Sequence, residues 1–380
     1  MSSPKNDDTL FSAYLDSLYA ISHSVGTVHT YKIGLNHFKQ FVLENHQSTV
    51  VNIIENIKSG KLDVYRILGE FVTYLDKNGK QPPSIHLWMA STKGFLWHED
   101  VKIYSEEFKK RVKLPKERRH REEPLTKEIL VRLLRNLPVK LQTAVLFAVA
   151  SGIRVGELVQ IKVSDIDFNS KPTKVKIRAE ITKTKEQRET FLTTEATIAL
   201  KDYLKRVFSW KESENNLAIS DEIIFGTLRT QNEEYQSKSK KQGREFRCTP
   251  MYIAECTLLT TLARHIQKIP ELSRLNENGR RMIHFHAFRK YFRTTVGDTV
   301  GRDFAEALMG HHFYLDTYYL QTEEKRREMY LKAEPYLTIS DYAKIEKDLN
   351  MIKEDYKSIM EFCEKFGFKL TEKQEMMLKP

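Results

Sequence analysis

The chain has 380 residues, of which 40% are hydrophobic and 30% are charged. This length exceeds what a single hydrophobic core usually serves, so we expect two domains, and the composition excludes a chain that is disordered throughout. Lys and Arg outnumber Asp and Glu by 62 to 51, which gives a formal net charge of +11. Clustered positive charge favours nucleic acid as a partner, although a basic protein without a polyanion partner has the same net charge.

Cysteine usage and hydropathy bear on the compartment. The three cysteines, Cys248, Cys256 and Cys363, form no CxxC pair and are odd in number, which argues against a zinc site and against a disulfide framework. No run approaches the ~20 apolar residues that span a bilayer, and the N-terminal segment lacks the apolar stretch of a signal peptide. We therefore expect a soluble, cytoplasmic protein.

The N-terminal part has the apolar spacing of amphipathic helices. From 11 to 97, apolar residues recur every three or four positions, as a helix with one buried face requires. Breaks at 22–24, 58–61 and 78–83 divide this part into about four helices. The sequence therefore predicts a small all-helical domain over 1–112.

A strongly basic segment follows this domain. Residues 109–121 read KKRVKLPKERRHR and hold eight Lys or Arg among thirteen positions. The composition indicates a linker, placed at 113–123, that is either a solvated tether or a strap whose cations contact DNA phosphates. The expected DNA-contacting residues are Lys109, Lys110, Arg111, Lys113, Lys116, Arg118, Arg119 and Arg121.

The second predicted domain covers 124–338, and Thr126 has the type and position of a helix N-cap. Residues 174–181 alternate charged and apolar side chains, as a half-buried strand does, and 189–192 fits the returning strand of a hairpin. Helical spacing prevails elsewhere, so we expect a mainly α fold with a small antiparallel β-sheet. Residues 230–249 are polar and aperiodic, which indicates a surface loop or disordered insert, either a spacer or a DNA contact.

The C-terminal tail, 339–380, has a heptad pattern. Its apolar positions alternate spacings of three and four, which predicts one long helix. The helix packs either on its own chain or on a neighbouring protomer. The positions are Tyr342, Ile345, Leu349, Ile352, Tyr356, Ile359, Cys363 and Phe366.

Two segments place cationic side chains where packing does not require them. In SGIRVGEL, residues 151–158, an apolar helix stops at Ser-Gly and Arg154 stands at the entry of the next helix. A guanidinium there can hold a phosphate, and the alternative is a surface ion pair with Glu157. His286 and Arg289 lie three residues apart and share a helical face, which is either functional or merely solvated.

A third segment combines a helix end, histidines and a tyrosine pair. Gly310 ends the predicted helix, His311 follows it, and Tyr318 and Tyr319 come a short distance later. Any one such tyrosine pair is usually an ordinary core or surface feature.

Together, the order and content of these segments resemble the tyrosine recombinase (phage integrase) family over roughly 125–335. SGIRVGEL resembles its first arginine box, TKT at 182–184 its lysine turn, HAFR at 286–289 its His-x-x-Arg box, and MGH at 309–311 its Leu-Gly-His box. The segments after the tyrosine pair are most similar to integrases of archaeal viruses and plasmids. The resemblance implies the catalytic residues Arg154, Lys183, His286, Arg289, His311 and Tyr319, supported by Glu157.

Two of these assignments have an alternative in the sequence. The interval from His311 to the tyrosine pair is about one residue shorter than in many family members, so Tyr318 is the alternative nucleophile to Tyr319. Lys185 stands two residues beyond Lys183 and is the alternative lysine.

The resemblance also implies a fold and a reaction. The N-terminal domain would be a core-binding, SAM-like domain that closes with the catalytic domain as a C-shaped clamp on DNA. The tyrosine would cut DNA through a 3′-phosphotyrosine intermediate, and a DNA 5′-hydroxyl would reverse the attack. No ATP, cofactor or metal is implied, and the sequence offers neither a P-loop nor an obvious acidic cluster for two metals.

The implied role is integration or excision of a mobile element, such as a viral genome, by a homotetramer on double-stranded DNA attachment sites, associated with the nucleoid. The two arginines would stabilise the phosphorane-like transition state, with His286 as base, Lys183 as general acid and His311 as a phosphate ligand. The alternatives are a type IB topoisomerase-like nicking-closing enzyme and a catalytically inactive DNA-binding remnant.

Overall fold

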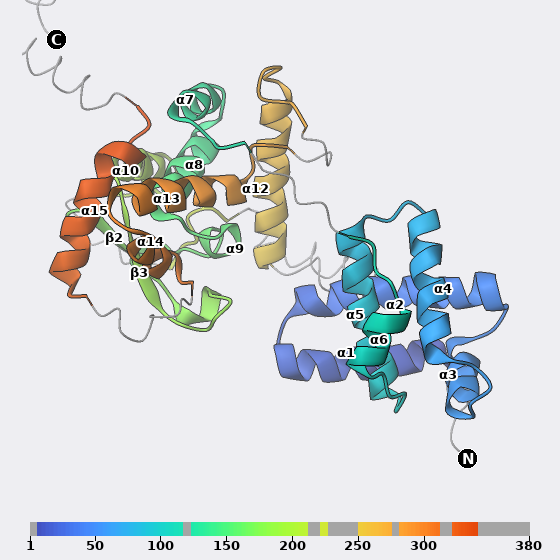
Figure 1. Cartoon of the computed structure of the whole chain (residues 1–380). Helices are drawn as coiled ribbons and strands as arrows, with labels where there is room; N and C mark the ends of the chain where they lie inside the picture. Colours follow the sequence, from blue (N-terminus) through green and yellow to red (C-terminus); the bar gives the residue numbers. More distant parts are fainter. Residues whose placement is uncertain are drawn as a thin grey trace, which may run out of the picture. The chain divides into compact units, whose positions relative to one another are not determined.

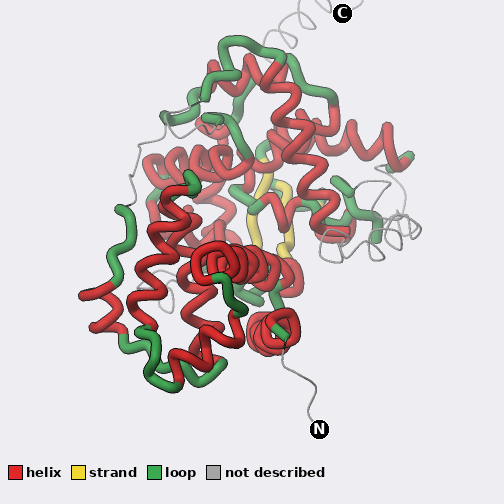
Figure 2. The backbone as a smooth tube through the Cα atoms, turned by 90° about the vertical axis from the view of Figure 1, so that its right-hand side faces the viewer, coloured by secondary structure: helices red, strands yellow, loops and turns green. Residues whose placement is uncertain are grey.

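The computed structural model describes residues 6–116, 123–211, 221–226, 250–275, 281–311 and 321–340. Within these ranges the chain is mainly α-helical with one small antiparallel sheet, as the sequence predicts (Figures 1 and 2). Contacts divide it into two compact units, Met1–His120 and Arg121–Pro380. No helix in the described ranges is long and apolar enough to cross a membrane.

The first unit is all-helical in its described part. Side chains at the N-caps start its first four helices, since the oxygens of Asn6, Ser24, Thr49 and Asp63 each accept a bond from a first-turn amide. The core is mostly aliphatic and includes several fully buried phenylalanines. The helices are α1 (Asp7–Ser22), α2 (Val25–His46), α3 (Val50–Lys58), α4 (Val64–Lys77), α5 (Pro82–His98) and α6 (Ser105–Arg111).

The three predicted helix breaks are confirmed, but the range 11–97 has five helices rather than about four, and a sixth follows it. One extra break lies between α2 and α3, where Gln47 adopts a left-handed φ of 46° and Thr49 caps the next helix. The other addition, α6, lies partly in the basic segment.

The first part of the basic segment, 109–116, contacts the first unit. The last residues of α6 come from this segment, Val112 is buried, and Leu114 packs against the core of the first unit. The Pro115 carbonyl lies 2.9 Å from Nε2 of His86. Two apolar side chains among many cations are therefore enough to dock this stretch. Arg118, Arg119 and Arg121 lie outside the described residues.

The sheet of the second unit has the order β1-β2-β3 and is antiparallel throughout. The predicted strand 174–181 is wrong in its second half, because β2 ends at Ile177 and Ala179–Ile181 forms a 3-10 turn. Ile181 still packs against the core, so the apolar period continues without sheet pairing. The strands are β1 (Ile166–Asp167), β2 (Thr173–Ile177) and β3 (Arg188–Leu192).

Helix α8 is the most buried helix of the second unit and packs against α10 and α13. Thr126 caps α7 through Oγ1, which accepts from the Ile129 amide, as predicted. The predicted insert 230–249 and the heptad helix from 341 onward lie outside the described residues. The described helices are α7 (Lys127–Arg135), α8 (Val139–Ser151), α9 (Val155–Leu158), α10 (Thr194–Phe208), α12 (Pro250–Gln267), α13 (Phe285–Thr299), α14 (Arg302–Met309) and α15 (Glu323–Leu337).

Candidate active site

The turn between α8 and α9 is fixed by its own side chains. α8 ends at Ser151, whose hydroxyl donates to the Phe147 carbonyl at 2.6 Å and accepts from the Ile153 amide at 3.3 Å. Thr190 on β3 donates to the Ser151 carbonyl at 2.9 Å. Arg154 follows as the N-cap residue of α9, so the structure confirms its predicted position at a helix entry.

Gly152 within this turn has no room for a side chain. Its φ is 62°, and an added Cβ would lie 2.3 Å from Cδ1 of Phe292, which is fully buried. We expect Gly152→Ala to lower the free energy of unfolding by about 1–3 kcal/mol, because a tight core must shift and a left-handed φ is strained. Urea denaturation measures this. Gly156→Ala is the matched control, because its Cβ would meet only an ordinary contact at 3.6 Å. Equal stability of the two variants would contradict the prediction.

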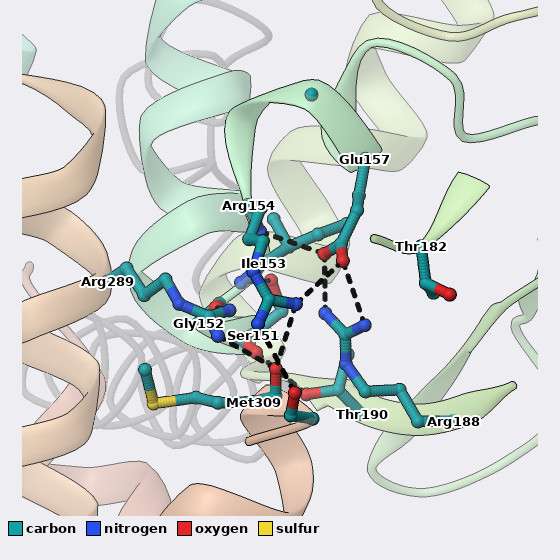
Figure 3. A network of polar contacts seen from close by, with 12 residues as sticks. Ser151, Gly152, Ile153, Arg154, Glu157, Thr182, Arg188, Thr190, Arg289 and Met309 are labelled. Atoms are coloured by element: carbon teal, nitrogen blue, oxygen red, sulfur yellow. Dashed lines mark hydrogen bonds and ion pairs between the residues drawn. The ribbon is translucent and has the colours of Figure 1, made fainter. Parts of the chain in front are cut away.

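Glu157 is the buried anion of the site, with 3% of its side chain exposed. Its carboxylate accepts from Nη1 of Arg154 at 3.0 Å and from both Nη atoms of Arg188 at 3.0 and 2.5 Å (Figure 3). Burial raises the pKa of Glu157, but the bonds from Arg188 and Arg154 outweigh burial, so the pKa is lowered. The pair between Arg154 and Glu157 is therefore a buried contact and not the surface pair that the sequence also allowed.

Sequence reasoning missed Arg188. It opens β3, and beyond its two bonds to Glu157 its Nε donates to the Leu308 carbonyl at 3.1 Å. Only 9% of its side chain is exposed. Arg188 thereby joins β3, α9 and the end of α14. Its only sequence signal is a charged residue beside an expected strand, which is common on solvated hairpins.

Arg289 on α13 lies between the turn at Gly152 and the end of α14, and it is 2% exposed. It donates to the Gly152 carbonyl, to the Met309 carbonyl at 2.8 Å and to Nε2 of His311 at 2.9 Å. Burial, together with the neighbouring guanidinium groups of Arg154 and Arg188, lowers the pKa of Arg289 to about 9. Arg289 is therefore still a cation at neutral pH.

The C-terminal end of α14 collects these cations. Arg154 donates to the Met309 carbonyl at 3.4 Å and to the Gly310 carbonyl at 3.2 Å. Free carbonyls at a helix end carry partial negative charge, which holds guanidinium groups in place. Gly310 ends α14 with a φ of 65°, so the predicted helix end is confirmed. We call Arg154, Arg188 and Arg289 the arginine cluster.

His311 lies directly beyond this helix end. Its Nδ1 pairs with the Glu306 carboxylate and its Nε2 faces Arg289. Burial lowers the pKa of His311, and the nearby Arg289 and Arg154 lower it further, against the opposing effect of Glu306. The structure thus gathers the four residues Arg154, Glu157, Arg289 and His311, which the sequence singled out, and adds Glu306 and Arg188 to them.

The remaining predicted residues are placed as follows. His286 is exposed on the first turn of α13, with its ring centroid 6.3 Å from that of His284, whereas Arg289 one turn later is buried. The face they were expected to share is therefore divided between solvent and core. Lys183 is exposed in the loop between β2 and β3. Tyr318 and Tyr319 lie outside the described residues.

The first turns of α15 are held against the sheet by ion pairs. Lys174 on β2 contacts Glu323 at 3.0 Å, and Arg326 donates to Glu189 on β3 at 3.0 Å. Tyr330 is fully buried and donates to the Ala150 carbonyl at 2.7 Å, which fixes α15 on α8.

Paired arginines and a histidine at one helix end, followed in the sequence by a tyrosine pair, are the features on which the resemblance to tyrosine recombinases rests. Residues 119–317, more than half of the chain, match the model of the phage integrase family. The chain therefore belongs to the phage integrase family and is a tyrosine site-specific recombinase. The matched stretch ends immediately before the tyrosine pair. No curated protein sequence matches the chain.

Solved structures share the fold. A lambda integrase dimer bound to a COC′ core site is similar with a TM-score of 0.55 and 16% identity, covering 84% of this chain and 78% of that one. A lambda integrase tetramer bound to a Holliday junction has a TM-score of 0.53, 18% identity and coverage of 84% and 81%. A Tn1549 transposon integrase in complex with circular intermediate DNA has a TM-score of 0.50 and 16% identity, and the match covers 86% of this chain and 99% of that one.

Proposed function

We propose that this recombinase integrates or excises a mobile element by attack of Tyr319 on a DNA phosphodiester, with Arg154 and Arg289 as the groups that stabilise the reacting phosphate. The observation that carries the proposal is the convergence of Arg154, Arg289 and His311 at the end of α14. These residues come from segments far apart in the sequence, and the tyrosine pair comes a few residues after His311 in the sequence.

The arginines suit a pentavalent phosphorus. Negative charge grows on the non-bridging oxygens in the transition state, so cations fixed there stabilise that state more than the ground state. Each guanidinium has five N–H donors, so Arg154 can keep its bond to Glu157 while another N–H reaches the phosphate. The buried carboxylate and the α14 carbonyls hold both groups in advance, which reduces the reorganisation that the reaction requires.

The proton transfers are assigned through the family resemblance. The Tyr319 oxygen forms a bond to phosphorus as its proton passes to His286, and the bond from phosphorus to the 5′ oxygen breaks as Lys183 protonates the leaving oxygen. Both proposed proton carriers are exposed, where DNA can reach them. Religation is the reverse attack by a 5′-hydroxyl.

For partners, we propose double-stranded attachment sites and a homotetramer. Support comes from the solved relatives, which include a lambda integrase dimer on a core site and a tetramer on a Holliday junction. An origin among archaeal viruses or plasmids and association with the nucleoid are finer proposals. The first rests on the resemblance of the residues after the tyrosine pair, and the second rests on the proposed DNA partner.

For the domains, we propose a core-binding domain over 1–112, a basic linker over 113–123, a catalytic domain over 124–338 and a tail over 339–380 that contacts a neighbouring protomer. The first of these assignments is supported by the first unit, which is all-helical where the structure describes it.

A two-site recombination assay tests the function. A recombinase joins flanks from two attachment sites into new products, whereas a nicking-closing enzyme only relaxes supercoils. A suicide substrate, nicked near the cleavage position, traps the covalent intermediate. Recombinant product together with trapped adduct is the expected result. Adduct without recombinant product would favour the topoisomerase-like alternative, and absence of both would favour the inactive remnant.

The basic linker should contribute affinity with little sequence choice. Replacing Arg118, Arg119 and Arg121 with Ala should reduce the slope of log K against log salt by about 3, because each lost phosphate contact removes about one unit. Fluorescence anisotropy with duplex DNA over a salt series measures the slope. A triple variant with Lys205→Ala, Arg206→Ala and Lys332→Ala, at exposed positions of α10 and α15, also removes three charges and is the control for net charge. An unchanged slope in the linker variant would show that the linker is only a tether.

A further inference from the structure

Glu306 lies on α14 one turn before His311, and both of its carboxylate oxygens are occupied. Oε2 pairs with Nδ1 of His311, and Oε1 accepts from Nε of Arg293 on α13. The Glu306 side chain is 13% exposed. The turn at Gly310 also returns the His311 amide to the Glu306 carbonyl at 3.1 Å. The imidazole is therefore held by its own helix at both backbone and side chain.

These contacts determine which ring nitrogen carries the proton. A guanidinium has only donors, so Nε2 of His311, which lies 2.9 Å from Nη2 of Arg289, must offer its lone pair. The single ring proton is then on Nδ1 and is donated to Glu306. A carboxylate partner on one ring nitrogen fixes the tautomer in this way.

The charges facing His311 keep the ring neutral while no phosphate is bound. Arg289 and Arg293 face this region from α13, Arg154 from α9 and Arg188 from β3, and Glu306 on α14 is the opposing carboxylate. The cations disfavour a further positive charge, which agrees with the lowered pKa of His311.

A phosphodiester in the arginine cluster reverses this balance. Its negative charge attracts Arg289 and favours an imidazolium, and Glu306 already stabilises the other end of the ring. We propose, on the basis of the proposed function, that Glu306 is a positioning residue that presents Nε2 of His311 to the reacting phosphate and lets His311 take up a proton there. The proton comes from solvent and forms an N–H bond at Nε2, and this N–H donates a hydrogen bond to a non-bridging oxygen. No bond to phosphorus changes in this step.

The positioning of His311 by Glu306 can be tested by NMR on the protein without DNA. Long-range ¹H–¹⁵N correlation spectra of the histidine rings, with His311→Ala used to assign the signal, report the tautomer and the pKa of His311. We expect the Nδ1–H tautomer in the unaltered protein. Glu306→Gln should lower the pKa of His311 by about one unit, because a neutral amide replaces the carboxylate. Glu306→Asp keeps the charge and should restore part of the shift.

The second readout is the pH profile of single-turnover cleavage on a suicide substrate. Glu306→Gln should move the alkaline limb of the profile about one pH unit lower. At a pH above the alkaline limbs of both proteins, the variant should therefore cleave about tenfold more slowly than the unaltered protein. Glu328→Gln, which removes an exposed carboxylate on α15, is the matched control and should leave the profile in place.

An unchanged His311 pKa and an unchanged profile in Glu306→Gln would overturn the proposal, as would a uniform loss of rate at every pH. Failure of the proposed function gives a different result. In that case the unaltered protein forms no adduct at any pH, while the tautomer measurement in the free protein still reports on Glu306.

Discussion

Tyr319→Phe is expected to abolish the covalent adduct between protein and DNA while leaving DNA affinity nearly unchanged. The substitution removes the attacking oxygen and keeps the ring, so contacts made by the ring survive. No other group in the proposed mechanism supplies a nucleophile to phosphorus. Denaturing gel analysis of a labelled suicide substrate measures the adduct, and anisotropy on the same duplex measures affinity.

Tyr318→Phe is the matched control and should still form the adduct. Neighbouring side chains on a helix point about 100° apart, so only one tyrosine of such a pair can face the phosphate. Thr322, which caps α15 through its hydroxyl, begins the segment whose resemblance favours the second tyrosine. Adduct from Tyr319→Phe but not from Tyr318→Phe would assign the nucleophile to Tyr318.

Local chemistry made parts of the fold predictable. The Ser-Gly stop after an apolar helix, the N-cap at Thr126 and the left-handed Gly310 each depend on a few adjacent residues, and the structure has all three. The mainly α class with a small antiparallel sheet follows from apolar periods of the same short range. The predicted strand was wrong at Ile181, where the alternating apolar pattern continues beyond the end of β2. Packing against the core, and not sheet pairing, partly buries this side chain.

The supporting residues of the site could not be predicted because their partners are distant in sequence. Arg188 is 31 residues from Glu157 and 120 from Leu308. Neither residue type nor spacing reveals that a strand-start arginine turns inward. Glu306 is only 5 residues from His311, but a glutamate in a short amphipathic helix reads as a solvated residue until α13 brings Arg293 to its other oxygen.

The site combines rigid cations with two exposed residues that we propose as proton carriers. The described contacts fix Arg188 and Arg289 on backbone carbonyls and a buried carboxylate, so their positions are set by the fold. Lys183 and His286 are exposed on a loop and a helix start. This division matches the needs of phosphoryl transfer, in which transition-state charge requires preorganised donors and proton transfer requires access to the nucleophile and leaving group.

Arg289→Lys is expected to slow single-turnover cleavage by at least about a hundredfold, which corresponds to roughly 3 kcal/mol of transition-state stabilisation. Arg289 bridges the Gly152 carbonyl, the Met309 carbonyl and His311 through a planar fork. A lysine keeps the charge but presents one ammonium on a flexible stem, so it cannot hold both carbonyls and also meet a phosphate oxygen. Because the Arg289 side chain is buried, a water molecule cannot bridge the gap that a shorter lysine side chain leaves.

Rapid-quench measurement of adduct formation at saturating enzyme gives the rate without the contribution of DNA binding. Arg132→Lys is the matched control, since Arg132 is about half exposed and pairs only with Glu271 among its described ion pairs. Its rate should stay within about threefold of the unaltered protein, as surface substitutions usually do little. Thermal unfolding of Arg289→Lys shows whether the fold is kept. A folded Arg289→Lys protein that cleaves as fast as the Arg132→Lys control would show that Arg289 holds the turn at Gly152 and does not contact the reacting phosphate.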